Sequence, residues 1–401
     1  MRGETIPLDE SLHRVLASDL TSNTDIPSAD RSAMDGYAVT AEDTFGASET
    51  NPAELRITGR VRIGETPNIK VGRGEAAAVA TGSYLPRGGV DAVVMVEYTR
   101  VSGNRLQVVK PVVPGQNVAK RGEDVKKGQI VVRRGTRIRP QDIGIIAALG
   151  VAEVPVVMRP RVAVISTGDE LIDPGEEKTE GKIYDINRHI IKAALLEAGG
   201  EPFDLGIVRD DAEDIKERLK RALSSADVVL ISAGTSVGER DLVPGILATL
   251  GEPGMLVHGI SLRPGYPTGL AVVDGKPVVS LPGYPVSNAF AFRVIVRPLL
   301  ARFLGTDVDV EPTVLAKMAR RVAAPGGLRT FVRVRLVEAG AGEGVRLVAE
   351  PIMASGAGVI SSLTQADGLL IIPEDSEGVD EGEEVEVVLL RPLKVRRNRA
   401  R

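Results

Sequence analysis

Three apolar segments in the middle of the chain end in polar loops. Residues 161–166, 202–208 and 227–232 are rich in the branched side chains of buried strands. Because the carboxyl ends of parallel strands meet at one edge of an open sheet, we expect the loops that follow them to lie together. These loops are Thr167-Gly168-Asp169-Glu170, then Arg209-Asp210-Asp211, and then 233–241, which contains Gly234, Thr235, Ser236, Gly238, Glu239 and Asp241.

The residue types in these loops predict a phosphorylated ligand bound with a divalent cation. Glycine lets the backbone approach a phosphate, and exposed N–H groups at a helix N-terminus donate to it. Carboxylates at the same edge would repel a phosphate unless a cation lay between the two. Mg²⁺ prefers such oxygen ligands and can polarise a phosphoryl group or orient water.

Simpler interpretations of the same residues stay open. Asp210 or Asp211 could cap the helix that follows, Asp241 could cap the next one, and Thr167 with Gly168 could form only a turn. The chain has no Walker A pattern, which disfavours an ordinary P-loop ATPase. With three histidines, no Ser–His–acid arrangement stands out.

The composition excludes several classes of protein. Cysteine is absent, which removes disulfides, thiolate catalysis and cysteine-bound metals, so a metal should be a hard cation on carboxylates. The net charge of −4, with no tryptophan and 3% aromatic residues, does not favour binding of nucleic acid or of an anionic membrane. No apolar run has the length of a membrane helix and no signal peptide is recognised, so we expect a cytoplasmic protein.

The 401 residues are too many for one core, and the pattern of elements changes along the chain. Short strands among turns fill the first part, with one helix expected over residues 8–16. Another is expected to start after Thr136, with Pro140 early in it and Gly150 at its end. From Arg161 the alternation of strands and helices predicts a doubly wound α/β domain at 156–306, whose last helix is interrupted by Pro298. The strands that follow are spaced as in a small β-barrel.

Several motifs together resemble those of the MoeA family of molybdopterin molybdenumtransferases, which is related to the E domain of gephyrin. They occur in the family's order and extend over nearly the whole chain. Among them are SAMDGYAV at 32–39, RGEDVKKG at 121–128, GKIYDINRHII at 181–191, ISAGTSVGERD at 231–241 and SLPGYPVS at 280–287.

The resemblance implies a homodimer of four-domain subunits. A linker domain would take residues 1–30 and 136–155, and a small β-rich domain would take 31–135. The central domain at 156–306 would be MogA-like and bind molybdopterin, and 307–401 would form the barrel. The implied activity joins molybdate or tungstate to adenylylated molybdopterin with release of AMP, using Mg²⁺, with a MogA-type adenylyltransferase as the expected partner.

The resemblance also implies the roles of particular residues. Asp35 and Thr81 would reach the α/β site across the dimer, and Glu170 and Asp241 would lie at the metal. Arg263 would hold an oxyanion, although a lone arginine is more often a surface residue. The implied catalytic set is Asp35, Thr81, Glu170, Asp210 and Asp241; the implied cofactor-binding set is Thr167, Gly168, Gly234, Thr235, Ser236, Gly238, Arg263, Pro282 and Gly283.

Five positions depart from the family pattern, and they concern the specificity for the oxyanion and the role of the barrel. They are Ala233 for glycine, Tyr266 for lysine, Tyr284 for asparagine, Ala357 for serine and Asp367 for asparagine.

Two other functions stay open. One is a non-catalytic molybdopterin-binding scaffold, which need not keep the acids. The other is a nucleotide phosphohydrolase on the same α/β fold.

Overall fold

The computed structural model describes residues 2–233, 242–338, 347–352 and 357–392. The chain divides into two compact units, one of Thr5–Val156 and one of Met1–Glu4 with Val157–Arg401. We describe each unit by itself. No helix of the described residues is both long and apolar enough to cross a membrane.

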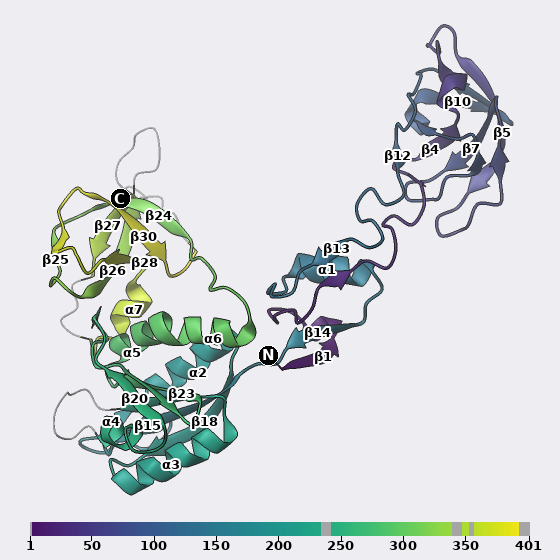
Figure 1. Cartoon of the computed structure of the whole chain (residues 1–401). Helices are drawn as coiled ribbons and strands as arrows, with labels where there is room; N and C mark the ends of the chain where they lie inside the picture. Colours follow the sequence, from purple (N-terminus) through teal and green to yellow (C-terminus); the bar gives the residue numbers. More distant parts are fainter. Residues whose placement is uncertain (1, 234–241, 339–346, 353–356, 393–401) are drawn as a thin grey trace. The chain divides into compact units, whose positions relative to one another are not determined.

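A six-stranded sheet forms the centre of the larger unit (Figure 1). Its first four strands run parallel, and the last two form an antiparallel hairpin at one edge. In spatial order the strands are β18 (Glu201–Val208), β15 (Arg161–Thr167), β19 (Val228–Ala233), β23 (Lys276–Pro282), β22 (Gly269–Val273) and β20 (Pro253–His258).

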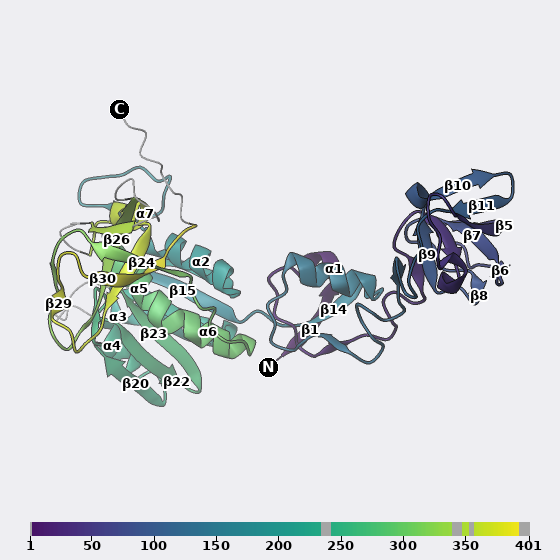
Figure 2. The ribbon, with the colours of Figure 1, turned by 90° about the horizontal axis from the view of Figure 1, so that it is seen from above.

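Helices cover both faces of this sheet, which confirms the doubly wound fold (Figures 1 and 2). Alternate strand residues face opposite layers: Val162 and Val164 pack with α2, α5 and α6, whereas Ala163 and Ile165 pack with α3 and α4. Both faces are apolar because both are buried. The helices are α2 (Asn187–Ala198), α3 (Ala212–Ser225), α4 (Leu242–Leu247), α5 (Pro285–Ala291) and α6 (Arg297–Leu304).

The expected interruption of the last long helix takes the form of a π-helical turn over Phe292–Val296, between α5 and α6. The Arg297 N–H donates to the Phe292 carbonyl, five residues earlier. Pro298 has no N–H to donate, and its ring crowds the carbonyl four residues before it, so the ordinary hydrogen-bond pattern cannot continue through it.

Five strands after the α/β domain close into the expected barrel. β26 pairs with β27 on one side and β28 on the other, so the order β26-β27-β24-β30-β28 returns to its start. β21 (Leu262–Arg263) pairs with β26, and Phe290 of α5 stacks on Phe331 of β26, joining barrel and α/β domain. The strands are β24 (Thr313–Met318), β26 (Arg329–Glu338), β27 (Leu347–Pro351), β28 (Gly368–Ile372) and β30 (Glu384–Leu389).

The smaller unit is rich in β-structure, as its sequence predicts. A six-stranded sheet and a linker region make up this unit, and α1 (Pro140–Ala148) of the linker packs on a core around Leu16, Ile138 and Ile146. In spatial order the strands are β10 (Thr99–Ser102), β11 (Arg105–Val108), β5 (Ala53–Val61), β7 (Glu75–Val79), β4 (Gly36–Val39) and β9 (Ala92–Met95).

The helix expected over residues 8–16 is wrong. Only a short 3₁₀ turn forms, at Leu8–Glu10, and Leu12 is exposed. Val15 and Leu16 are buried instead through β-bridges to Arg137 and Val156. Pairing with a distant part of the chain therefore overrides the local helical spacing.

Candidate functional site

β15 delivers two of the predicted acids to the carboxyl edge of the sheet. Thr167 ends the strand, and Gly168 turns the chain with a φ of +154°. A Cβ atom on Gly168 would lie 2.7 Å from Oε2 of Glu170, so glycine permits the carboxylate to fold back there. Asp169 and Glu170 themselves are exposed.

Asp210, at the end of the neighbouring strand β18, meets these acids. Its backbone N–H donates to Oδ1 of Asp169 at 3.4 Å. Partial burial of the carboxyl group raises the pKa of Asp210, and the charges of Glu170 and Asp169 raise it further, against hydrogen bonds from Asp169 and Thr167. The structure thus brings Thr167, Glu170 and Asp210 to one edge.

The capping alternative holds for Asp211 and not for Asp210. The side chain of Asp211 accepts the backbone N–H groups of Glu213 and Asp214, at 3.0 and 3.1 Å, and so begins α3. Asp210 takes no part in that cap and is left available at the sheet edge. Asp241, together with Gly234, Thr235, Ser236 and Gly238, lies outside the described residues.

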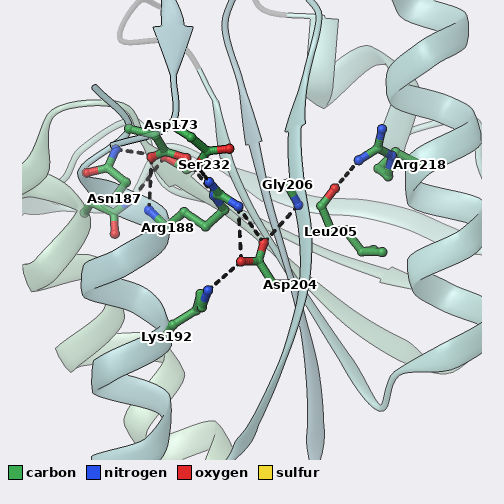
Figure 3. A network of polar contacts seen from close by, with 11 residues as sticks. Asp173, Asn187, Arg188, Lys192, Asp204, Leu205, Gly206, Arg218 and Ser232 are labelled. Atoms are coloured by element: carbon green, nitrogen blue, oxygen red, sulfur yellow. Dashed lines mark hydrogen bonds and ion pairs between the residues drawn. The ribbon is translucent and has the colours of Figure 1, made fainter. Parts of the chain in front are cut away.

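A buried polar cluster, which the sequence interpretation missed, lies behind the ends of β19 and β23. The Asn187 amide donates to Ser232 Oγ at 2.9 Å and to the Gly283 carbonyl at 2.8 Å (Figure 3). The Asn288 amide donates to the Pro282 carbonyl at 3.0 Å. Pro282 and Gly283 therefore sit at the same edge as Thr167, held by two asparagine side chains.

Three polar atoms of this region are buried without a hydrogen-bond partner among the described residues. They are Oδ1 of Asn187, Oδ1 of Asn288 and Oγ of Ser166. Unpaired buried acceptors are costly and mark places where a ligand or water completes the site. The signal for Asn187 was present in the motif at 181–191, but nothing in the motif says that the side chain is buried.

Two arginines lie where the barrel meets the α/β domain. Arg263 is exposed on β21, whose partner strand is β26. Arg333 of β26 is partly buried on the strand face that also carries Phe331, and burial lowers the pKa of its guanidinium. Nε and Nη1 of Arg333 have no hydrogen-bond partner among the residues described, a feature that the sequence interpretation also missed.

The positions that depart from the family pattern have varied surroundings. Tyr266 and Tyr284 are about half exposed, at 51% and 49%. The Ala357 carbonyl accepts the N–H of Val286 at 3.0 Å, so this barrel loop lies against the start of α5. Asp367 accepts the Leu336 N–H at 2.9 Å and pairs with Arg391, which gives it a structural role within the barrel.

Asp35 and Thr81 contact each other in the smaller unit. Oδ1 of Asp35 accepts both the backbone N–H and the hydroxyl of Thr81, at 2.7 and 3.1 Å. These hydrogen bonds lower the pKa of Asp35. The next residue must be glycine, because a Cβ on Gly36 would lie 1.9 Å from the Val94 carbonyl oxygen. A close backbone approach thus holds Asp35 in place beside Thr81.

The described residues contain no group of three His, Asp or Glu side chains arranged to hold a metal ion. Asp169, Glu170 and Asp210 nevertheless interact electrostatically, as the raised pKa of Asp210 shows. A metal at this edge would therefore need further oxygens, from Asp241 or from a bound phosphate. Mg²⁺ is commonly held in that way, by one or two carboxylates and substrate phosphates.

The fold and this edge define a multidomain α/β protein whose candidate ligand site lies at the ends of parallel strands. Three family descriptions match it in succession. The MoeA N-terminal region, domains I and II, matches residues 1–150. The probable molybdopterin binding domain matches 163–302, and the MoeA C-terminal region, domain IV, matches 315–390.

Similar proteins extend over nearly the whole chain. A putative molybdopterin biosynthesis protein of Methanocaldococcus jannaschii is 38% identical, over 96% of this chain and 92% of its own. The molybdopterin molybdenumtransferase of Bacillus subtilis is 32% identical, over 97% of this chain and 91% of its own. The solved structure of the molybdopterin biosynthesis MoeA protein from Pyrococcus horikosii is 41% identical, has a TM-score of 0.81, and the match covers 98% of this chain and 95% of that one.

The chain therefore belongs to the MoeA family of molybdopterin molybdenumtransferases. This confirms the family predicted from the motifs, and with it a transferase of molybdenum cofactor biosynthesis.

Proposed function

We propose that this protein inserts molybdate, or tungstate, into adenylylated molybdopterin and releases AMP. The observation that carries the proposal is the carboxyl edge of the α/β sheet, where the charge of Glu170 acts on Asp210 at the ends of β15 and β18. At the ends of β19 and β23, polar atoms of Asn187 and Asn288 are buried without a partner among the described residues. Acids suit a cation between protein and phosphate, and buried acceptors suit the N–H groups of a pterin. The adenylylated pterin would come from a MogA-type adenylyltransferase.

The acids fit Mg²⁺ because their like charges are not compensated among the described residues. Glu170 and Asp241 would hold the ion together with phosphate oxygens of the substrate. Bound Mg²⁺ would neutralise phosphate charge and polarise the phosphoryl group. Asp210 is suited to accept and hold a proton beside the reacting phosphate, because its raised pKa brings it closer to neutral pH.

The oxyanion would be held by arginine. Arg333 presents a partly buried guanidinium whose Nε and Nη1 have no hydrogen-bond partner in the described part of the chain. A tetrahedral oxyanion accepts several N–H bonds and compensates such a buried charge. Arg263, on the neighbouring strand β21, would contribute a second cation from the exposed side.

We further propose a homodimer whose sites are shared between subunits. The support is the family resemblance at Asp35 and Thr81, which implies that these residues reach the α/β site of the partner. The hydrogen bonds from Thr81 lower the pKa of Asp35 and so favour its ionised form. An ionised carboxylate held by two hydrogen bonds is suited to orient a substrate group at a fixed distance.

The deciding experiment measures AMP release from adenylylated molybdopterin with Mg²⁺, in the presence of molybdate, tungstate or neither. We expect release that depends on the oxyanion and on Mg²⁺. Release without either oxyanion would identify a phosphohydrolase instead. Tight pterin binding with no release would identify a scaffold. Glu170→Gln serves as the control, since it should bind pterin and release little AMP.

A further inference from the structure

A buried arginine at the start of α2 binds three carboxylates (Figure 3). Arg188 is 6% exposed. Its guanidinium bonds Asp185 through Nε at 3.0 Å, Asp204 through Nη1 at 2.9 Å, and Asp173 through Nη2. Its backbone N–H also donates to Asp185, at 3.1 Å. One side chain thus joins acids from three separate parts of the α/β domain.

The three acids occupy different positions relative to the candidate site. Asp173 directly follows β16 (Leu171–Ile172), which begins just after Glu170. Asp185 directly follows β17 (Ile183–Tyr184), the parallel partner of β16. Asp204 belongs to the body of β18. Arg188 therefore ties both ends of the segment 168–186, which carries Glu170, to the edge of the main sheet.

The segment has few other attachments that reach Glu170. Within the segment, the Leu171 N–H donates to the Gly168 carbonyl, and the Ile183 N–H donates to the backbone carbonyl of Glu170, at 2.8 Å. At its start, the Gly168 N–H donates to the Val208 carbonyl at the end of β18, at 3.3 Å. Lys182 donates to the carbonyl of Asp169. The bond from Gly168 and the 3.4 Å bond from the Asp210 N–H to Asp169 attach the segment to β18 on the N-terminal side of Glu170. The Asp173–Arg188–Asp204 connection adds an ion-paired attachment on its C-terminal side.

The charges make this tie specific to arginine. A planar guanidinium offers donors in several directions at once, whereas an ammonium group is a point charge. Removing a partly or fully buried partner leaves an uncompensated charge, which is costly. Asp204 keeps Lys192 and the Gly206 N–H if Arg188 is lost, but no other partner is recorded for the Asp173 side chain among the described residues.

We propose that Arg188 is a positioning residue, which holds Glu170 at the sheet edge through its ion pair with Asp173. This inference rests on the proposed function, in which Glu170 acts on the substrate. Among the described residues, the guanidinium of Arg188 pairs with Asp173, Asp185 and Asp204 and not with Glu170. Its effect is transmitted along the few residues from Asp173 back to Glu170.

Two matched substitutions test the tie without removing the arginine. Asp173→Asn removes the ion pair of Arg188 with the acid nearest to Glu170 in the segment, and Asp204→Asn removes its ion pair with β18, while Arg188 keeps two carboxylates in each. Hydrogen–deuterium exchange, followed by mass spectrometry, measures the effect of both substitutions in the full chain. Asp173→Asn and Asp204→Asn should both speed exchange of peptides within 168–186, about tenfold for Asp173→Asn. Asp204→Asn should in addition speed exchange around Gly206, whose N–H Asp204 accepts at 2.9 Å.

The turnover number then shows whether the ion pairs of Arg188 matter for catalysis. In the AMP-release assay Asp173→Asn should lower kcat about 10- to 100-fold with little change in KM, because the acid is misplaced rather than removed. Asp204→Asn should also lower kcat, because it breaks the same connection at its β18 end. Arg188→Lys should regain part of the kcat lost in Arg188→Gln, since it restores the charge without the planar geometry.

The outcomes distinguish this inference from the proposed function. Full kcat in Asp173→Asn, when Glu170→Gln is inactive, overturns the positioning role. Unchanged exchange in 168–186 overturns the tie itself, whatever the activity. If Glu170→Gln keeps full turnover, the proposed role of Glu170 fails, and the exchange data still decide whether Arg188 holds the segment.

Discussion

Asp210 lies where carboxylates from two strand ends meet, and its raised pKa is the physical result of that placement. Because folding raises the pKa of Asp210, ionising this residue lowers the stability of the folded protein. The loss of stability appears as the pH rises from the usual pKa of aspartate through the raised pKa. Such a residue is expected where function, rather than stability, selects the side chain.

Asp210→Asn should therefore lower the activity and raise the stability of the protein. Asparagine removes the repulsion from Glu170 and Asp169, so the variant should melt higher than the wild type near pH 7 and equally at about pH 3. AMP release should fall about 100-fold or more. Thermal unfolding at the two pH values checks the first effect, and a wild type that melts higher at neutral pH would contradict it.

Gly36→Ala should destabilise the smaller unit. The new Cβ would lie 1.9 Å from the Val94 carbonyl oxygen, a backbone atom that can move only if β4 and β9 separate. We expect a loss of about 1–3 kcal/mol or more, as for other overpacked sites. Urea unfolding measures this loss. Gly144→Ala, where no atom lies within 4 Å and φ is not positive, is the control.

The residues that sequence reasoning missed share a physical cause. Asn187 and Arg188 are buried with particular partners, and Arg333 is partly buried with two nitrogens that lack a partner among the described residues. Burial and partners are tertiary facts, and the local pattern around an arginine in a strand or helix does not contain them. Glycine and acidic residues that follow apolar strands, by contrast, indicate the carboxyl edge of a sheet from the sequence alone. Glu170 and Asp210 could therefore be predicted.

At the scale of elements, strand and helix patterns predicted the α/β domain because its residues alternate between two buried faces. The helix expected over residues 8–16 failed for the opposite reason, since Leu16 is buried by a bridge to Val156, far along the chain. The π-helical turn also lay beyond prediction. Pro298 indicates an interruption, but the packing of the neighbouring turns decides where the extra residue is placed.

The link between α2 and β18 should depend on pH. Burial would raise the pKa of Asp204, but hydrogen bonds from Lys192 and Arg188 outweigh it and lower the pKa from 3.8 to about 2. Because the pKa of Asp204 is lower in the folded protein, its ionised form stabilises the fold at pH values above the usual pKa. This stabilisation is lost as the pH falls from the usual pKa towards the lowered one. Asp204 thus holds the segment to the sheet only while it is ionised.

Asp204→Asn should accordingly lower the melting temperature by a few degrees at neutral pH, with a difference that shrinks as the pH falls from about 4 towards 2. Lys192→Met provides a matched variant that removes one partner and keeps the acid. Thermal or urea unfolding across this range makes the measurement. A difference that grows on acidification would mean that Asp204 is not held ionised by its cations.

At the scale of the whole molecule, the proposed site draws on both compact units. Asp35 and Thr81 belong to one, and Glu170 and Asp210 belong to the other. A shared site in a dimer requires that substitutions in the two units complement each other when they are carried by different subunits. This requirement tests the proposed assembly independently of any single residue's role.

Asp35→Asn and Asp210→Asn should each be inactive alone as homodimers. After joint refolding or co-expression, about half of the dimers should be mixed, and each mixed dimer should carry one intact site of two, giving about a quarter of wild-type AMP release. If both acids of a site came from the same subunit, mixing would restore nothing. Light scattering on the same samples confirms that dimers are present, so that a failure to complement cannot be attributed to monomers.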